Sequence, residues 1–261
     1  MTPESAHGGL PRPEVLFLDV GDTLIRAHPS WAGVYRLGLA EAGIDVDQQE
    51  LESALREATQ TGAWSFEGPF EATAEASFER IKEFDAGVLG ALGHADLSDE
   101  VFVLIEAAFD QRSSWFVFPD VLPAVEALAA AGIRMAVVSN WLWGGPELLH
   151  DLELARHFEA LVISARVGYQ KPHAGIFEHA LEVMGVAPGR AVHVGDNYQA
   201  DVVGARRVGI TPILIDRRSD DPARVRAENS DPDLPAVRDL LELLDLLAVP
   251  RPTAAVALRP A

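Results

Sequence analysis

The sequence predicts an α/β protein whose parallel sheet is interrupted by an inserted helical domain. An unbroken apolar run from Val15 to Leu18 ends abruptly in acidic residues, which is typical of a central strand covered on both faces. Residues 28–113 then show helical periodicity and no strand-like segment. From Phe118 onward strands and helices alternate, which indicates right-handed βαβ units and a parallel sheet.

Composition narrows the class of partners. The 261 residues are 48% hydrophobic and carry a net charge of −19, which disfavours binding to a nucleic acid backbone or an anionic membrane. Small anions are not excluded, because a metal ion or one lysine reverses the field locally. The chain contains no cysteine, which excludes disulfides, thiolate metal sites and cysteine catalysis. With no signal-peptide-like start and no stretch long enough to span a membrane, we expect a cytoplasmic protein.

Four helices are expected in the inserted block. Ser30 can cap the first, which Gly43 ends, and Asp47 with Glu50 forms a capping pair at the start of the second. The expected ranges are 30–42, 47–60, 71–92 and 98–113. We interpret residues 28–113 as a helical insertion.

The rest of the chain is expected to form the sheet and the helices that cover it. Further strands are expected at 133–139, 161–164, 191–194 and 212–215, the last of these being the final strand. Helices are expected at 120–131, 146–154, 174–184, 200–208 and 234–247, with a surface loop at 216–233. The core would then consist of residues 1–27 and 114–248, with flexible segments at 1–12 and 249–261.

Polar residues follow four of the predicted strands, whose carboxyl ends meet at one edge of a parallel sheet. They are Asp19, Gly21, Asp22 and Thr23 after the first strand, Ser139 and Asn140 after the second, Lys171 after the third, and Asp196 and Asp201 after the fourth. Carboxylates suit Mg²⁺, and a lysine with hydroxyl groups suits phosphate oxygens. Lys171 is one of only two lysines among 21 basic residues. Lysine in place of arginine at this position indicates a need for a compact point charge.

These motifs, in this order, resemble the haloacid dehalogenase (HAD) superfamily of hydrolases, in its branch with a helical C1 cap (subfamily I). The matching residues are Asp19 and Thr23 for the first motif, Ser139 for the second, Lys171 for the third, and Asp196 and Asp201 for the fourth. The match covers roughly residues 14–247, and four short motifs at strand ends are far more specific than one. The resemblance implies a Rossmann-like core with an inserted all-helical cap.

The resemblance also implies a mechanism. Asp19 would attack phosphorus to form an aspartyl-phosphate, which water then hydrolyses. A Mg²⁺ ion would be held by Asp19, the main-chain carbonyl of Gly21, and Asp196. Asp201, in the same acidic metal-binding group, would orient Lys171 or metal-bound water.

The remaining motif residues would bind the phosphate. Ser139 and Lys171 would contact the transferring phosphoryl oxygens, with Thr23 beside them. Asn140 is either a turn residue or contacts phosphate through its side chain and N–H. The expected partner is a small phosphorylated metabolite, and the oligomeric state is left open.

The chain departs from the phosphatase pattern at one position. Phosphatases of this superfamily carry a second Asp, the general acid and base, two residues after the nucleophile, and here that position is Gly21. General acid–base help contributes about 10²–10⁴-fold, so its loss slows hydrolysis of poor leaving groups. Either Asp22 substitutes as a catalytic acid, or the substrate has a good leaving group, or turnover is low. A metal-free 2-haloacid dehalogenase and a phosphate-binding regulatory protein are the rival functions.

Several aromatic and basic residues outside the motifs have two interpretations each. Trp141 and Trp143 follow the second motif and either stack on a substrate or pack against the cap. The same alternatives apply to Trp31, Tyr35, Trp64, Phe66 and Phe70. We interpret Lys82 as a solvated helix residue. No zinc site is assigned to the scattered histidines His28, His173 and His193.

Overall fold

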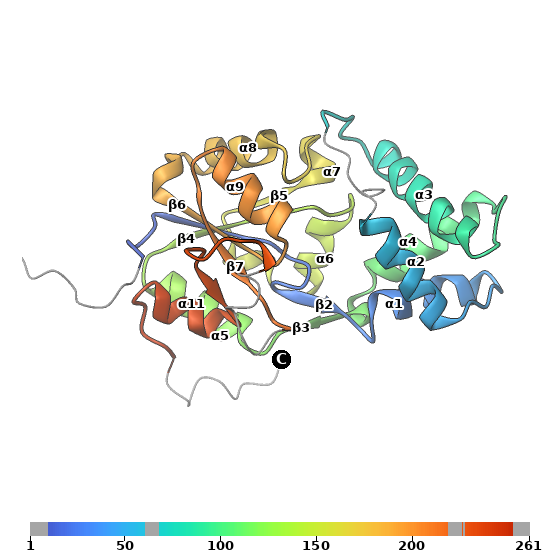
Figure 1. Cartoon of the computed structure of the whole chain (residues 1–261), viewed down its shortest axis with the longest axis horizontal. Helices are drawn as coiled ribbons and strands as arrows, with labels where there is room; N and C mark the ends of the chain where they lie inside the picture. Colours follow the sequence, from blue (N-terminus) through green and yellow to red (C-terminus); the bar gives the residue numbers. More distant parts are fainter. Residues whose placement is uncertain (1–9, 61–67, 219–225, 227, 253–261) are drawn as a thin grey trace, which may run out of the picture.

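The structure is a computed structural model that describes residues 10–60, 68–218, 226 and 228–252, and its core is a six-stranded sheet (Figure 1). The strands lie in the order β5-β4-β1-β6-β7-β8, and all neighbouring pairs are parallel. Their bounds are β1 Val15–Leu18, β4 Arg134–Ser139, β5 Ala160–Ile163, β6 Ala191–Gly195, β7 Thr211–Ile215 and β8 Ala236–Val237. The predicted α/β, Rossmann-like fold is confirmed.

Helices cover both faces of the sheet (Figure 1). On one face lie α8 and α9, and on the other lie α5 and α11. Their bounds are α5 Val121–Ala130, α8 Ala174–Met184, α9 Gly204–Arg207 and α11 Leu240–Leu246. A π-helical turn, Tyr198–Val203, precedes α9, and two short helices, α6 Gly145–Asp151 and α7 Ser164–Val167, complete the core.

The central strand β1 is buried on both sides. Leu16 and Leu18 pack in the cluster of α5 and α11, whereas Val15 and Phe17 pack in the cluster of α8 and α9. Successive side chains of a strand point to opposite faces, so a strand between two helical layers needs an apolar residue at every position. This requirement explains the unbroken apolar run before Asp19.

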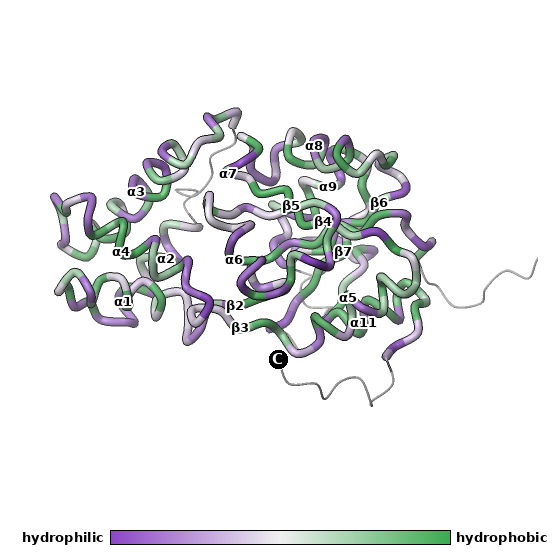
Figure 2. The backbone as a smooth tube through the Cα atoms, turned by 180° about the vertical axis from the view of Figure 1, so that it is seen from behind, coloured by the Kyte–Doolittle hydropathy of each residue, from purple (hydrophilic) through white to green (hydrophobic). Residues whose placement is uncertain are grey.

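Four helices form the insertion between β2 and β3, seen at the right of Figure 1. Their bounds are α1 Trp31–Glu41, α2 Gln48–Gln60, α3 Ala74–Ala91 and α4 Asp99–Asp110. Ser30 Oγ accepts the N–H of Gly33 at 3.0 Å, and Asp47 Oδ1 accepts the N–H of Glu50 at 3.0 Å. Both predicted helix starts are therefore confirmed. Hydrophilic and hydrophobic residues are interspersed along these helices, as expected where one side faces solvent (Figure 2).

Three short strands were not predicted. Ile25–Ala27 (β2) and Trp115–Val117 (β3) form an antiparallel pair at the junction of the insertion and the core. The expected helix at 234–247 is wrong at its start, because β8 pairs with β7 and α11 begins only after Asp239, whose side chain caps it. The expectation that β7 is the final strand is therefore also wrong. Strands of two or three residues are too short for their periodicity to be recognised.

In the described part of the chain, no helix combines the length and apolar character needed to cross a membrane. The expectations for residues 1–9 and 253–261, and for Trp64 and Phe66, lie outside the described residues.

Candidate active site

The polar residues predicted at the strand ends lie at the carboxyl edge of the sheet. β1 pairs with β4 on one side and with β6 on the other. Asp19 therefore follows β1 between Ser139, the last residue of β4, and Asp196, which comes directly after β6. An open α/β sheet presents its ligand site at this edge.

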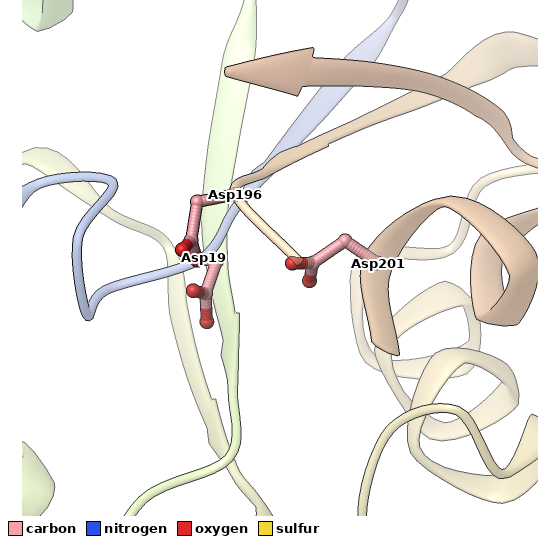
Figure 3. A group of neighbouring side chains, drawn as sticks. All are labelled: Asp19, Asp196 and Asp201. Carbon is pink, nitrogen blue, oxygen red and sulfur yellow. The ribbon is translucent and has the colours of Figure 1, made fainter. Parts of the chain in front are cut away.

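Three carboxylates converge there. Oxygen atoms of Asp19, Asp196 and Asp201 all lie within 4.8 Å of one another (Figure 3). Burial raises the pKa of Asp196 well above its ordinary value, and the charges of Asp19, Asp201 and Asp22 add to the rise. Burial also raises the pKa of Asp19, although Lys171 opposes this shift. Crowded hard oxygen atoms of this kind fit Mg²⁺, which prefers oxygen ligands.

Lys171 neutralises part of this negative charge. Its Nζ donates to Oδ1 of Asp19 and to Oδ1 of Asp201, at 2.6 Å in each case. Burial alone lowers the pKa of Lys171, but the two carboxylates outweigh it and the net shift is upward. A charged amine beside Asp19 can stabilise negative charge on a phosphoryl group.

Three donors hold Asp201. Its Oδ1 accepts from Lys171 and lies 2.8 Å from Nε2 of His193, and its Oδ2 accepts the N–H of Asn197 at 2.9 Å. Burial opposes ionisation, but Lys171 and His193 hold the pKa of Asp201 well below its usual range. Because an ionised carboxylate only accepts hydrogen bonds, Nε2 of His193 carries the proton. These contacts favour a positioning role for Asp201 over direct metal ligation.

His193 was not identified from the sequence as part of this arrangement, and Gly195 was identified only as the glycine that precedes Asp196. A Cβ at Gly195 would lie 2.1 Å from Cγ of Asp201, so the carboxylate occupies the space that a side chain would need. A glycine at the end of a strand is a recognisable sign of such a close approach. The signal for His193 was weaker, a single polar residue within the apolar strand β6.

The side chain of Asn140 is directed at the main chain of Lys171. Its Oδ1 accepts the Lys171 N–H at 2.7 Å, and its Nδ2 donates to the Lys171 carbonyl at 2.9 Å. Both ends of the amide are engaged, so the structure favours neither a plain turn residue nor a side chain that binds phosphate. The amide fastens the loop that carries Lys171 to the end of β4. Contact between phosphate and the Asn140 N–H stays a prediction.

The turn after β1 contains an unpartnered hydroxyl group. Thr23 is fully buried, and among the described residues its Oγ1 finds no hydrogen-bond partner. Its carbonyl accepts from Nε and Nη2 of Arg217 at 2.9 and 2.7 Å, and the same guanidinium binds Asp120 at 2.9 Å. The turn is thereby fixed. The hydroxyl is enclosed and lacks a partner among the described residues, and its contact with phosphate stays a prediction. No sequence pattern pointed to Arg217, because its partners are far away along the chain.

Two tryptophans face the position where the second Asp is missing. A Cβ at Gly21 would lie 3.2 Å from Cζ3 of Trp141 and 3.8 Å from Cζ2 of Trp31. The φ angle of Gly21 is not positive; the left-handed residue is Asp22, with φ of 50°. Oδ2 of Asp22 lies 3.5 Å from Nε1 of Trp31, a long hydrogen bond. A side chain at position 21 would therefore meet indole rings.

A cavity of about 560 Å³ lies beside these tryptophans, with residues of both the insertion and the sheet edge in its wall. Trp31, Tyr35 and Trp141 line it, and the same rings pack on other aromatic residues of the insertion and its junction with the core. Trp115 joins them, with ring centroids 5.3 Å from Trp31 and 4.9 Å from Trp141. Stacking on a substrate stays a prediction. Trp143 does not line the cavity: its main-chain N–H donates to Ser77 Oγ of the insertion at 3.2 Å, and its ring lies under the guanidinium of Arg166.

The parallel sheet and the buried carboxylates at its edge define an α/β protein with a candidate active site at the carboxyl ends of its strands. The chain belongs to the haloacid dehalogenase-like hydrolases, whose family profile matches residues 13–209. This stretch contains every motif residue identified above.

The relatives include phosphatases. The chain is 31% identical over 201 residues to haloacid dehalogenase-like hydrolase domain-containing protein 3 of Xenopus laevis, covering 76% of this chain and 82% of the relative. It is 27% identical over 242 residues to glyceraldehyde 3-phosphate phosphatase of Methanothermobacter thermautotrophicus, covering 90% and 99%. The structure of L-2-haloacid dehalogenase from Xanthobacter autotrophicus matches with a TM-score of 0.68 at 20% identity, covering 90% and 98%. The last likeness concerns the fold alone.

Proposed function

We propose that the protein is a Mg²⁺-dependent phosphatase that acts on a small phosphorylated metabolite through an aspartyl-phosphate. The observation that carries this proposal is the carboxylate of Asp19, which lies at the sheet edge 2.6 Å from the amine of Lys171. A carboxylate can attack a phosphate dianion only where positive charge offsets their repulsion. The phosphatase names among the relatives support the same type of reaction.

Each residue has a defined part in this proposal. A carboxylate oxygen of Asp19 bonds to phosphorus as the bond to the leaving oxygen breaks. Water then cleaves the aspartyl-phosphate, which returns the free carboxylate and releases phosphate. Lys171, Ser139 and Thr23 donate to the phosphoryl oxygens during both steps. The unpartnered Oγ1 of Thr23 supports its part.

A Mg²⁺ ion would be held by Asp19, Asp196 and the carbonyl of Gly21, and when bound it would neutralise charge as the anionic substrate approaches. Asp201 and Asn140 act on Lys171, one through its amine and the other through its main chain. Asp22 shapes the turn after β1. With Asp22 in this role, no side chain donates a proton to the leaving group, which must depart without one.

The proposal extends to the organisation of the chain. Residues 28–113 act as a cap domain over a catalytic core of residues 1–27 and 114–248. The lining of the cavity by helices of the insertion and by residues of the sheet edge supports this division. We further propose a cytoplasmic location, with which a chain free of cysteine is compatible.

Gly21 favours a second candidate function, a metal-free 2-haloacid dehalogenase, because such hydrolases do not need the missing Asp. The acidic pair Asp196 and Asp201 beside the nucleophile favours the phosphatase. Gly21 also leaves open a phosphate-binding regulatory protein with little turnover.

Paired assays distinguish these functions. We expect hydrolysis of 4-nitrophenyl phosphate with Mg²⁺, little hydrolysis with a chelator, and no halide release from 2-haloacids. Asp19→Asn, which keeps the shape of the side chain, should reduce turnover to background. Acid quenching during turnover should trap phosphate on the peptide that contains Asp19. Halide release without a metal ion would show that the protein is a dehalogenase instead. Phosphate binding without turnover would show that it is a phosphate-binding regulatory protein.

A further inference from the structure

The proposed mechanism leaves one buried acid in the insertion unused. Asp85 of α3 is only 2% exposed, and its Oδ1 accepts the hydroxyl of Tyr35 from α1 at 2.6 Å. Both residues line the 560 Å³ cavity. A carboxylate is seldom fully buried without a partner of opposite charge, and the partner here is a neutral phenol.

The cavity connects Asp85 with the surroundings of the nucleophile. On the core side its lining includes Asn140, which holds the main chain of Lys171, and Trp141, whose ring faces Gly21. On the insertion side it includes Asp85 and Tyr35. Asp19 is not itself among the lining residues, so a phosphate ester bound there reaches Asp85 only if its leaving group extends past Trp141 into the cavity.

The charges around the cavity favour a cation at its inner end. The arginines of the lining, Arg56 and Arg218, are exposed, so solvent and salt screen them. Glu106 adds a second, half-buried negative charge close to Asp85. Burial raises the pKa of Asp85 to about 7, partly opposed by the hydrogen bond from Tyr35 and assisted by Glu106. A cationic ligand would hold this carboxylate in its ionised form.

The aromatic wall favours the same kind of ligand. The faces of tryptophan and tyrosine rings attract cations, and ammonium groups are typically recognised by several such rings together. The lining contains Trp31, Trp115, Trp141 and Tyr35.

We propose that Asp85 and Tyr35 form a subsite for an ammonium group on the leaving group of the substrate. The substrate class is then a phosphate monoester whose alcohol or phenol part carries an amine. This inference rests on the proposed phosphatase function, since it assigns the leaving-group side of the same cavity. The ammonium group donates to the carboxylate of Asp85, and the phenol of Tyr35 keeps that carboxylate in place.

Three esters of similar size test the subsite. They share the anionic phosphate and differ in the substituent on the ring: the cationic ester, 4-(2-aminoethyl)phenyl phosphate, has an ammonium group there, the neutral ester, 4-ethylphenyl phosphate, has an uncharged ethyl group, and the anionic ester, 4-(2-carboxyethyl)phenyl phosphate, has a carboxylate. We expect kcat/KM for the cationic ester to exceed that for the neutral ester at least about 10-fold, mainly through KM, and the anionic ester to be the poorest substrate. Asp85→Asn should remove the preference for the amine and change kcat/KM for the neutral ester less than about 3-fold.

A charge-matched control is available on the same helix. Glu79→Gln removes one negative charge from the exposed side of α3, outside the cavity lining, and should leave the preference unchanged. Equal kcat/KM for the cationic and neutral esters, or an amine preference that persists in Asp85→Asn, would overturn the subsite.

Binding of 2-phenylethylamine, measured by calorimetry, separates this inference from the proposed function. We expect the amine to bind the wild-type protein at least about 10-fold more tightly than Asp85→Asn. If it does so while none of the esters is hydrolysed, the subsite stands and the phosphatase proposal falls. If the esters are hydrolysed and the amine binds both proteins alike, the phosphatase stands and the subsite falls.

Discussion

Nζ of Lys171 lies 2.6 Å from Oδ1 of Asp201, and neither side chain is more than 2% exposed. Removing one partner of a buried ion pair leaves an uncompensated charge, which costs about 3–5 kcal/mol. The amine that faces Asp19 therefore depends on Asp201 for its position and its charge.

Asp201→Asn should lower the free energy of unfolding by about 3 kcal/mol and kcat/KM by at least about 100-fold. The amide no longer balances Lys171 and presents it with a possible donor. Urea unfolding and steady-state kinetics measure the two effects. Glu14→Gln is the control, because it breaks an exposed pair with Arg190 and should cost less than about 1 kcal/mol. An Asp201→Asn protein as active as the control would disprove the positioning role.

Gly195→Ala should damage the site without removing any functional group. The new Cβ would overlap the carboxylate of Asp201, which must then move away from Lys171 and His193. We expect a loss of about 1–3 kcal/mol in stability and a fall in kcat similar to that of Asp201→Asn. Gly189→Ala is the matched control, since nothing lies within 4 Å of a Cβ there. Normal turnover in Gly195→Ala would show that the displacement of Asp201 is harmless.

Mg²⁺ should stabilise the protein, and Asp196 should mediate the effect. An acid with a raised pKa contributes stability at low pH that is lost as the pH rises through the folded-state pKa, so ionisation of Asp196 without a metal ion costs folding stability. Mg²⁺ at 100 times its Kd should add about 2.7 kcal/mol. Asp196→Asn should lose this gain and be at least as stable as the metal-free wild type. Thermal melting curves recorded with Mg²⁺ and with a chelator test this prediction. A melting temperature that does not change with millimolar Mg²⁺ would contradict a bound ion.

Gly21→Asp should restore an acid and raise turnover of alkyl phosphates selectively, by at least about 10-fold, because only poor leaving groups need a proton. The backbone permits the change, but the Trp141 ring must yield a few tenths of an ångström. The double variant with Trp141→Phe provides that space.

Asp22→Asn is the companion test. Only a slight loss on alkyl phosphates is expected if Asp22 shapes the turn. A selective loss of about 100-fold or more would identify Asp22 as the working acid.

Asp85→Asn should change how stability depends on pH. The pKa of Asp85 is about 7 in the folded protein, above the unfolded value, so its contribution is full below about pH 4 and is lost as the pH rises through about 7. The wild type should lose up to about 4 kcal/mol from this group between pH 4 and pH 8. The variant lacks this loss. Its free energy of unfolding, measured by urea titration, should therefore increase relative to that of the wild type as the pH rises. Parallel pH curves for the two proteins would refute the assignment.

The elements predicted best from the sequence carry their signals locally. The helix expected at 174–184 has those bounds in the structure, because His173 caps its start and Gly185, with φ of 58°, ends it. By contrast, β2 and β3 are three residues long and pair across the whole insertion, so neither segment reveals its partner. The beginning of the last helix was misjudged because its leucine-rich pattern extended over β8.

The candidate site divides in the same way. The meeting of Asp19, Ser139 and Asp196 follows from strand order alone, since parallel strands end at one edge. The direction of each side chain could not be predicted from the sequence. For this reason the binding of the Asn140 amide to the main chain of Lys171 was missed. The clamp from Asp120 through Arg217 to Thr23 depends on distant segments that only folding brings together.

The pairing of β2 with β3 places the exit and the return of the chain side by side, with Ala27 directly opposite Trp115. The insertion is therefore a loop whose two ends are held together by this strand pair. The entropy cost of closing such a loop changes little with its length. Closure entropy alone thus places little limit on the length of this insertion, whereas contacts such as that between Ser77 and Trp143 tie its sequence to the core. A change in the length of the insertion would therefore leave the register of β1 with β4 and β6 in place, and with it the meeting of Asp19, Ser139 and Asp196.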